Sequence, residues 1–307
     1  MTAQRSPEGR SAPGGLVIVD KPAGMTSHDV VARVRRLAGT RKVGHAGTLD
    51  PMATGVLVVG VEKATRLLGH LTLADKQYQA TIRLGQATDT DDAAGTVTAT
   101  ASAADVTEDA VRAAVAALTG PIEQVPPGVS AIKIGGKRAY RLTRDGQAPE
   151  LAARPVTVHD FTVTGLRRQG GGRDGNFLDV DADVTCSSGT YVRALARDLG
   201  QALGTGGHLT ALRRIRSGNY RIEDARTLDD LGREFAVTSL ADAAAAAFPR
   251  VDLTVEDAAR VAHGGRLPAS VFPAADGPAA VFGPDGSLIA LMQEEGGQTR
   301  PLAVFVP

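Results

Sequence analysis

The chain has 307 residues, of which 43% are hydrophobic and 22% charged, and its formal net charge is zero. These values are typical of a soluble globular protein of two or three domains, and no apolar run reaches the roughly 18 residues that a membrane helix needs. The single cysteine, Cys186, excludes an intrachain disulfide and a cysteine-based zinc site. Because the N-terminus also lacks the pattern of a signal peptide, we expect a cytoplasmic protein.

The zero net charge hides an uneven distribution. Lys and Arg outnumber acids nine to three between Lys133 and Arg173, and six to one between Arg193 and Arg221. A neutral chain can therefore carry a basic face that meets phosphates. Charges mixed over a solvated surface would explain the same counts, so the distribution alone leaves both interpretations open.

The N-terminal third begins with a polar lead-in, residues 1–14, which we expect to be disordered. An apolar run between Gly15 and Pro22 predicts a buried strand. Ser27 is expected to cap a helix that ends at Gly39. Further elements are expected, in chain order, as a shaped loop at residues 42–55, a strand at 56–61, a short helix at 63–71, strands at 78–84 and 96–100, and a helix at 107–118.

The next stretch, residues 121–155, is long, basic and rich in Pro and Gly, which is typical of a functional or mobile loop. After it we expect strands at 155–166 and 177–186, a helix at 190–203, strands at 209–215 and 220–222, a helix at 241–248 and a linker at 249–251. The remaining residues, with a hairpin turn at Pro284–Gly286, predict a small β-rich module. The whole order indicates an α+β fold with a mixed, mostly antiparallel sheet flanked by helices.

Common catalytic motifs are missing from the sequence. There is no G-x-x-x-x-G-K-[ST], no G-x-G-x-x-G after a strand and no G-x-S-x-G. The six histidines show no H-x-x-x-H or H-E-x-x-H pairing. We therefore expect no nucleotide cofactor, no metal and no serine-hydrolase chemistry.

One loop combines glycines with an acid: Gly44–Pro51, GHAGTLDP. Pro51 biases Asp50 toward an extended backbone, and the glycines allow a ligand to approach the main chain closely. An aspartate with no catalytic role, hydrogen-bonded to the backbone of its own turn, would fit the same sequence. Physical chemistry alone therefore leaves the role of Asp50 open.

Ordered blocks of the sequence resemble the TruB family of tRNA pseudouridine synthases, in their bacterial form, over about three-quarters of the chain. The blocks are LVIVDKPAGMTSHDV (Leu16–Val30), VGHAGTLDPMATGVLVV (Val43–Val59), KQYQATIRLGQATDTDDAAG (Lys76–Gly95), VPPGVSAIKIGGKRAY (Val125–Tyr140), CSSGTYVRALARDLG (Cys186–Gly200) and GGHLTALRR (Gly206–Arg214). The resemblance implies a pseudouridine synthase fold, with a catalytic domain at 15–249 and a small PUA-like domain at 250–307. It also implies that uridine becomes pseudouridine in the tRNA T loop, at position 55, without any cofactor.

The resemblance assigns roles to five residues of the expected pocket. Asp50 corresponds to the family's nucleophile, which attacks C6 of the base or C1′ of the ribose, and the sequence does not choose between these routes. Tyr78 matches the tyrosine that stacks on the target base, and Leu212 matches a leucine that walls the pocket. Tyr191 and Arg193 belong to the S-x-G-T-Y-[VI]-R block, in which the guanidinium would hold the Asp50 carboxylate in its ionised form. The ordinary alternatives are an edge aromatic at Tyr78 and a surface charge at Arg193.

Other residues are implied to contact RNA or to support the loop. His45 resembles the histidine that engages the T loop when the target base is flipped out, and Lys21 and Pro22 would brace the catalytic loop. A basic, thumb-like insertion at about 125–154 would close over the T arm through phosphate contacts. Its cations are Lys133, Lys137, Arg138, Arg141 and Arg144.

The expected partner is thus the tRNA T stem-loop, with no membrane and no obligate protein partner, so we expect a monomer. The C-terminal module is short and carries few basic residues, so its contact with RNA stays open. Two other functions remain possible on the sequence: an RNA-binding or tRNA-folding protein whose catalysis is secondary, and the catalytic subunit of a guide-RNA complex.

Overall fold

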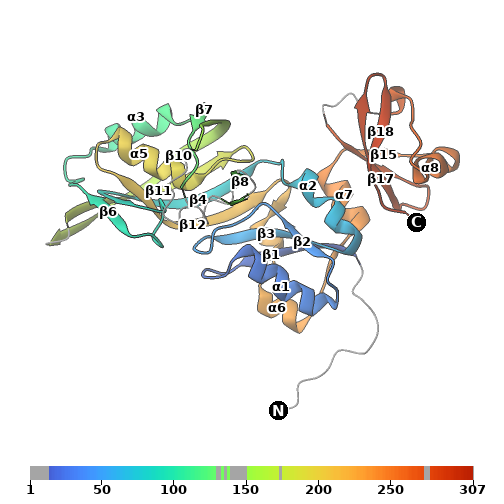
Figure 1. Ribbon diagram of the computed structural model, residues 1–307, viewed down its shortest axis with the longest axis horizontal. Helices are drawn as coiled ribbons and strands as arrows, with labels where there is room; N and C mark the ends of the chain where they lie inside the picture. Colours follow the sequence, from blue (N-terminus) through green and yellow to red (C-terminus); the bar gives the residue numbers. More distant parts are fainter. Residues whose placement is uncertain are drawn as a thin grey trace, which may run out of the picture.

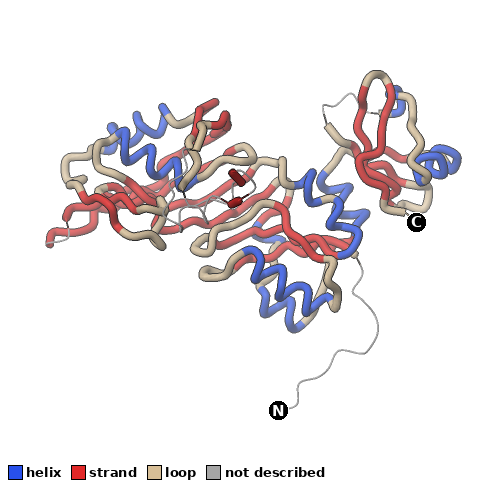
Figure 2. Tube along the Cα trace, in the orientation of Figure 1, coloured by secondary structure: helices blue, strands red, loops and turns tan. Residues whose placement is uncertain are grey.

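The structure is a computed structural model that describes residues 14–128, 133–134, 137–138, 151–172, 175–272 and 277–306. Within these residues, the body of the molecule is a ten-stranded curled sheet, extended along the long axis of the molecule (Figures 1 and 2). The strands along its main path are β14 (Thr238–Ser239), β1 (Gly15–Lys21), β3 (Thr54–Val61), β12 (Gly207–Ser217), β4 (Lys76–Leu84), β11 (Gly175–Cys186), β10 (Arg154–Gly172) and β7 (Gly120–Gln124). At its margins β2 (Val43–Ala46) pairs with β3, and β13 (Tyr220–Arg221) pairs with β12.

The pairings in this sheet are antiparallel in the described part of the chain, except for β3 with β12, which is parallel. The expected mixed, mostly antiparallel sheet is confirmed. Antiparallel alternation is clearest in β4, where Tyr78, Ala80, Ile82 and Leu84 are buried and the residues between them are more exposed. This alternation points Tyr78 toward the covered face of the sheet.

Two helix pairs cover the large sheet (Figure 1). α1 (Ser27–Ala38) and α6 (Leu228–Arg233) pack against β1 and β3, while α3 (Glu108–Ala117) and α5 (Val192–Ala202) pack against the half that contains β4, β10 and β12. A continuous core of buried aliphatic side chains runs through both halves. Because β4 and β12 cross the middle of the sheet, they join the half that carries α1 to the half that carries α5.

α1 shows how local sequence sets an element boundary. Thr26, and not the expected Ser27, is the N-cap: its side chain accepts a hydrogen bond from the Asp29 amide in a capping box. Gly39 ends the helix in the left-handed conformation, as expected. Ser27 is buried and bonds to another segment, because its hydroxyl both donates to and accepts from the backbone of Leu49.

A second, four-stranded sheet lies at the C-terminal end of the described chain. Its strands are β15 (Arg250–Asp252), β16 (Ala279–Phe282), β17 (Leu288–Glu295) and β18 (Gln298–Val304), and α8 (Val255–Ala262) packs on it. The expected C-terminal β domain is therefore present. The linker expected at 249–251 was wrong, because Arg250–Asp252 pairs in parallel with β16.

Other short elements complete the fold. The helix expected at 63–71 is split into a 3₁₀ turn, Glu62–Arg66, and α2 (Leu68–Leu71), and the loop expected at 42–55 begins with β2. β7 occupies the start of the stretch expected as a loop. Two small hairpins are β5 (Gln86–Thr88) with β6 (Val97–Thr100), and β8 (Lys133–Ile134) with β9 (Lys137–Arg138); the remaining elements are α7 (Leu240–Ala247) and 3₁₀ turns at Ile222–Asp224 and Ala269–Val271. No helix among the described residues is long and apolar enough to cross a membrane.

Candidate active site

A pocket of about 280 Å³ opens where the two halves of the large sheet meet. Three segments form its walls: the loop after β2, the first residues of β4 with the turn before them, and the start of α5. β12 contributes the fourth side. The lining residues that carry charge or an aromatic ring are Asp50, Lys76, Tyr78, Tyr191, Arg193 and Arg214.

The loop that carries Asp50 is held from both sides. The buried hydroxyl of Ser27 bonds to the Leu49 amide at 2.9 Å and to the Leu49 carbonyl at 3.0 Å. The fully buried ammonium of Lys21 donates to the Pro51 carbonyl at 3.2 Å, and to those of Met25 and Pro22. These contacts fix the backbone on each side of Asp50.

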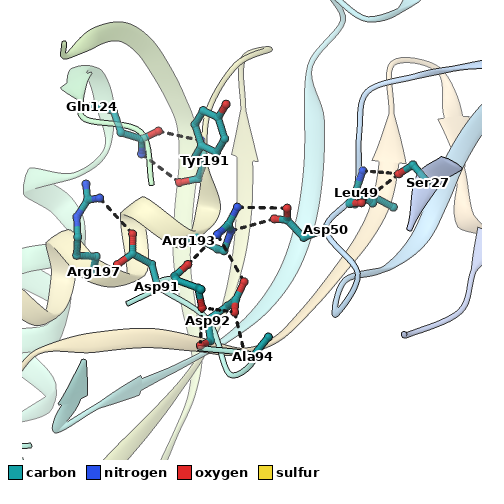
Figure 3. Close-up of polar contacts among 11 residues, drawn as sticks. Ser27, Leu49, Asp50, Asp91, Asp92, Ala94, Gln124, Tyr191, Arg193 and Arg197 are labelled. Atoms are coloured by element: carbon teal, nitrogen blue, oxygen red, sulfur yellow. Dashed lines mark hydrogen bonds and ion pairs between the residues drawn. The ribbon is translucent and has the colours of Figure 1, made fainter. Parts of the chain in front are cut away.

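Asp50 and Arg193 form a bidentate ion pair (Figure 3). Arg193 Nε donates to one carboxylate oxygen at 2.9 Å and Nη2 to the other at 3.2 Å. The guanidinium is almost fully buried, whereas about a third of the Asp50 side chain is exposed to the pocket. A planar, two-bond contact of this kind orients a carboxylate closely.

Asp92 lies on the other side of Arg193. Its carboxylate is 3.6 Å from Arg193 Nη1, which also donates to the Thr90 carbonyl at 2.7 Å. Asp92 is itself fixed, because it accepts hydrogen bonds from the Thr90 hydroxyl and the Ala94 amide. Sequence reasoning missed Asp92: it lies inside the block Lys76–Gly95, but nothing in the pattern distinguishes it from the neighbouring acids.

The start of α5 is tied to β7 and to the turn after β5. The buried side-chain amide of Gln124 makes two hydrogen bonds with the main chain of Tyr191. Its Oε1 atom accepts from the Tyr191 amide at 2.8 Å, and its Nε2 atom donates to the Tyr191 carbonyl at 3.2 Å. Arg197, one turn along α5, contacts Asp91 at 3.2 Å. Figure 3 shows the Tyr191 ring extending away from the Asp50–Arg193 pair, so the main chain of Tyr191 is what anchors this turn.

Tyr78 and Leu212 lie opposite this turn, on adjacent strands. Both side chains are buried, at 8% and 7% exposure, and both line the pocket. Burial raises the pKa of the Tyr78 hydroxyl, with the Arg214 guanidinium acting in the opposite direction. The pocket thus brings together the predicted residues Asp50, Tyr78, Tyr191, Arg193 and Leu212.

Three predicted residues lie outside this pocket. Lys21 and Pro22 line another cavity, together with Thr54 and Arg213. His45 is on β2 with its ring edge-on to that of His28, the centroids 5.5 Å apart. Burial, followed by His28 and Arg214, lowers the pKa of His45 to about 4, and its Nδ1 atom is buried without a hydrogen-bond partner in the described structure.

The structure describes only some of the residues that are predicted to contact phosphates. Arg141 and Arg144 lie outside the described residues, and for Lys133, Lys137 and Arg138 the structure gives the backbone pairing of β8 with β9 only. Within the described ranges, no group of three or more His, Cys, Asp or Glu side chains is placed to hold a metal ion.

Two further cations in the pocket, Lys76 and Arg214, were not singled out from the sequence. Each lies inside a block that resembles the family, but nothing in the pattern distinguishes a buried cation from an exposed one. Arg214 is 1% exposed and donates to the carbonyls of Val56 at 2.7 Å and Gly47 at 2.9 Å. Lys76 is 5% exposed and donates to the carbonyls of Thr72 and Ala74.

Comparison with known protein families shows the class of protein to which this fold and this site belong. The family model for the N-terminal domain of TruB family pseudouridylate synthases matches residues 35–192. Residues 193–249 match the tRNA pseudouridylate synthase B C-terminal domain, and residues 248–306 match the C-terminal part of tRNA pseudouridine synthase II. The chain belongs to the TruB family of pseudouridine synthases.

Curated relatives match the chain almost end to end. A tRNA pseudouridine synthase B from Thermobifida fusca is 62% identical over 291 residues, which cover 95% of this chain and 98% of the relative. A protein of the same name from Arthrobacter is 58% identical, with 95% and 97% covered. At this identity the chain is an isomerase of the same enzyme class.

Solved structures share the fold. A chain in the structure of an H/ACA RNP bound to a substrate RNA containing 2′-deoxyuridine superimposes with a TM-score of 0.69 at 27% identity, covering 95% of this chain and 85% of that one. A chain from an archaeal box H/ACA sRNP complex gives a TM-score of 0.64, also at 27% identity and with the same coverage. The similarity therefore extends over both sheets.

Proposed function

We propose that this enzyme converts uridine to pseudouridine in the T loop of tRNA, at position 55, with Asp50 as its nucleophile. The observation that carries this proposal is the bidentate Asp50–Arg193 pair inside the pocket. Relatives named tRNA pseudouridine synthase B, at 62% and 58% identity, support tRNA as the substrate.

The reaction moves the C1′ bond from N1 to C5 of the same uracil. The Asp50 carboxylate attacks C6 of the base or C1′ of the ribose, the C1′–N1 bond breaks, and the base turns within the pocket. C5 then bonds to C1′, the bond between Asp50 and C6 or C1′ breaks, C5 gives up its proton and N1 gains one. Because the product is an isomer of the substrate, the proposal requires no oxidant, water or nucleotide.

The pocket residues have distinct roles in this proposal. Arg193, held by Asp92, orients the carboxylate toward the incoming nucleoside. Tyr78 stacks on the base and Leu212 limits its position, since both are buried side chains of the pocket wall. The α5 turn at Tyr191 closes the opposite side.

A uridine inside a folded tRNA must leave its stack to reach the pocket, which requires a few kcal/mol. We propose that His45 contacts the T loop from which the base has been flipped, because β2 leads directly into the Asp50 loop. Residues 125–154 would contact the T arm through Lys133, Lys137, Arg138 and Arg141. In this proposal residues 15–249 are the catalytic domain, residues 250–307 are a small PUA-like domain, and a monomer acts without a protein partner.

The test is pseudouridine mapping of a T stem-loop RNA after incubation with wild type, Asp50→Asn and Asp105→Asn. Asp105 is exposed and outside the pocket, so it is a matched control for the loss of one carboxylate. We expect conversion at the T-loop uridine by wild type and Asp105→Asn, and none by Asp50→Asn. Conversion by Asp50→Asn would show that another group is the nucleophile.

The same experiment separates the alternatives. If no protein converts the RNA although all of them bind it tightly, the chain acts as an RNA-binding protein or needs a guide RNA. Adding a full-length tRNA and a cell RNA extract to the inactive reaction distinguishes these two outcomes.

A further inference from the structure

The charges around the pocket are not balanced. Arg193 is matched by two carboxylates, Asp50 at 2.9 Å and Asp92 at 3.6 Å. Lys76 and Arg214 line the same pocket, and among the described residues neither has a carboxylate within ion-pair distance. Two positive charges that line the pocket are thus without a carboxylate at ion-pair distance in the described structure.

Burying a cation without a counterion is costly, and groups whose pKa is strongly shifted by burial cluster at functional sites. Lys76 and Arg214 are 5% and 1% exposed, and main-chain carbonyls are their hydrogen-bond acceptors. The cost is visible in the ammonium of Lys76, where burial, together with Arg214, lowers the pKa to about 8.

The two cations converge on one point of the Asp50 loop. At Gly47, which has a φ of +73°, a Cβ atom would lie 3.4 Å from Arg214 Nη1 and 3.8 Å from Lys76 Cε. Tyr78 is on β4, two residues after Lys76, and is paired in register with Arg214 of β12. Both charges therefore lie next to the ring on which the base would stack.

We propose that Lys76 and Arg214 stabilise the negative charge that develops on the oxygens of uracil during the isomerisation. This inference rests on the proposed function. Attack at C6 moves an electron pair toward O4, and cleavage of the C1′–N1 bond leaves the pair on the uracil ring, so either route creates an anionic base. The formation of the C5–C1′ bond uses the electron pair of the anion. C5 then gives up its proton, N1 gains one and Asp50 is released as a carboxylate, so the product base is neutral.

The depth of the two cations favours the base over an RNA phosphate as the anion. Their side chains are more deeply buried than that of Asp50, which is 34% exposed. A planar base can enter a pocket of about 280 Å³ on its edge, whereas a phosphodiester in a continuous strand stays at the mouth. Fixed cations in a site without water stabilise such a charge far better than solvent does.

The first test compares Lys76→Met, which removes the charge at similar length, with Lys76→Arg, which keeps it. In single-turnover reactions on the T stem-loop we expect Lys76→Met to lower the rate of conversion about 100-fold, with RNA affinity changed less than about threefold. Lys76→Arg should recover at least a tenth of the wild-type rate. A loss confined to RNA affinity would overturn the inference and assign Lys76 to a phosphate contact.

A second test does not depend on turnover. Barbiturate is a pyrimidine that is anionic at neutral pH, whereas uracil is neutral. We expect wild type to bind barbiturate at least about tenfold more tightly than uracil, measured by calorimetry, and Lys76→Met and Arg214→Gln to bind both alike. Equal binding of both rings by wild type would overturn the inference, even if wild type converts RNA. If wild type converts no RNA but prefers barbiturate, the proposed function fails and the anion-accepting pocket stands.

Discussion

Asp92 is separated from the pocket by Arg193, and it is nevertheless expected to affect the reaction. Its buried carboxylate holds Arg193 from behind while Asp50 occupies the front of the same guanidinium. Without that second anion, Arg193 would bind Asp50 more strongly and could shift toward it, and shifts of about 1 Å can cost 100-fold in rate.

We therefore predict that Asp92→Asn lowers kcat on a T stem-loop RNA about 10- to 100-fold. The amide can still bond to Thr90 and Ala94, so the thermal unfolding temperature should change little. Steady-state kinetics and circular dichroism check the two parts, with Asp105→Asn as control. A kcat equal to that of the control would show that Asp92 only fills space.

Lys21 gives a prediction for the dependence of stability on pH. Burial lowers the pKa of this fully buried ammonium from 10.5 to about 8, with Asp50 acting in the opposite direction. The unfolded chain then holds its proton to higher pH than the folded chain. The contribution of Lys21 to the free energy of unfolding is therefore lowest below pH 8. It rises between pH 8 and 10.5, by at most about 1.4 kcal/mol per pH unit.

Urea unfolding of wild type and Lys21→Met at pH 7 and pH 9 measures this effect. We expect wild type to gain about 1 kcal/mol relative to the variant between the two pH values. If the difference in free energy of unfolding between wild type and Lys21→Met is the same at pH 7 and pH 9, Lys21 has the same pKa in the folded and unfolded chain. Cys186, whose pKa burial raises to about 11, is present in both proteins and cancels in the difference.

At the scale of elements, regular periodicity was the most informative part of the sequence. The strand expected at 78–84, the helix expected to end at Gly39 and the helix expected at 107–118 are present as β4, α1 and α3. The loop at 42–55 was only partly predicted, because β2 is four residues long and is stabilised by its pairing with β3. Such a strand depends on a partner that is close in space, which a local pattern does not contain.

The same limit applies to the candidate site. The glycine-rich loop pointed to Asp50, and the resemblance added Tyr78, Arg193 and Leu212, all of which line one pocket. Lys76 and Arg214 could not be distinguished from the other cations, because their burial results from the packing of β4, β12 and the Asp50 loop together. Burial of a charge is a property of tertiary structure.

Ser27 connects two of these elements, α1 and the Asp50 loop. We predict that Ser27→Ala lowers the free energy of unfolding by about 1–3 kcal/mol, because it leaves the buried amide and carbonyl of Leu49 without their partner. It should also lower kcat, since the backbone next to Asp50 is no longer fixed. Urea unfolding and single-turnover kinetics test both effects, and the exposed Ser102→Ala is the control. Normal stability with normal kcat would show that the loop needs no brace from α1.

At the scale of the molecule, the two sheets are not independent. One cluster of buried apolar side chains contains Leu16 and Val58 of the large sheet together with Phe282, Leu291 and Phe305 of the C-terminal part. Lys63 donates to the Phe305 carbonyl at 2.8 Å, and Arg66 donates to that of Val304. Figure 1 shows α2 and α7 lying between the sheets, and both contribute to the cluster. A linker was predicted at 249–251 because this shared core is built from residues far apart in the chain, and a local sequence pattern does not show such contacts.

A shared core predicts coupled unfolding. Phe305 is 3% exposed, so Phe305→Ala should lower the free energy of unfolding of the whole chain by about 3–5 kcal/mol while leaving one cooperative transition. Phe272→Ala is the matched control: this ring is only partly buried, and it packs on the separate core of the C-terminal sheet, so a smaller loss is expected. Urea unfolding followed by circular dichroism gives the free energies, and hydrogen exchange shows whether both sheets open together. If, in wild type, the amide hydrogens of β15–β18 exchange at a much lower urea concentration than those of β1 and β3, the sheets are separate folding units. The apolar cluster then does not couple them.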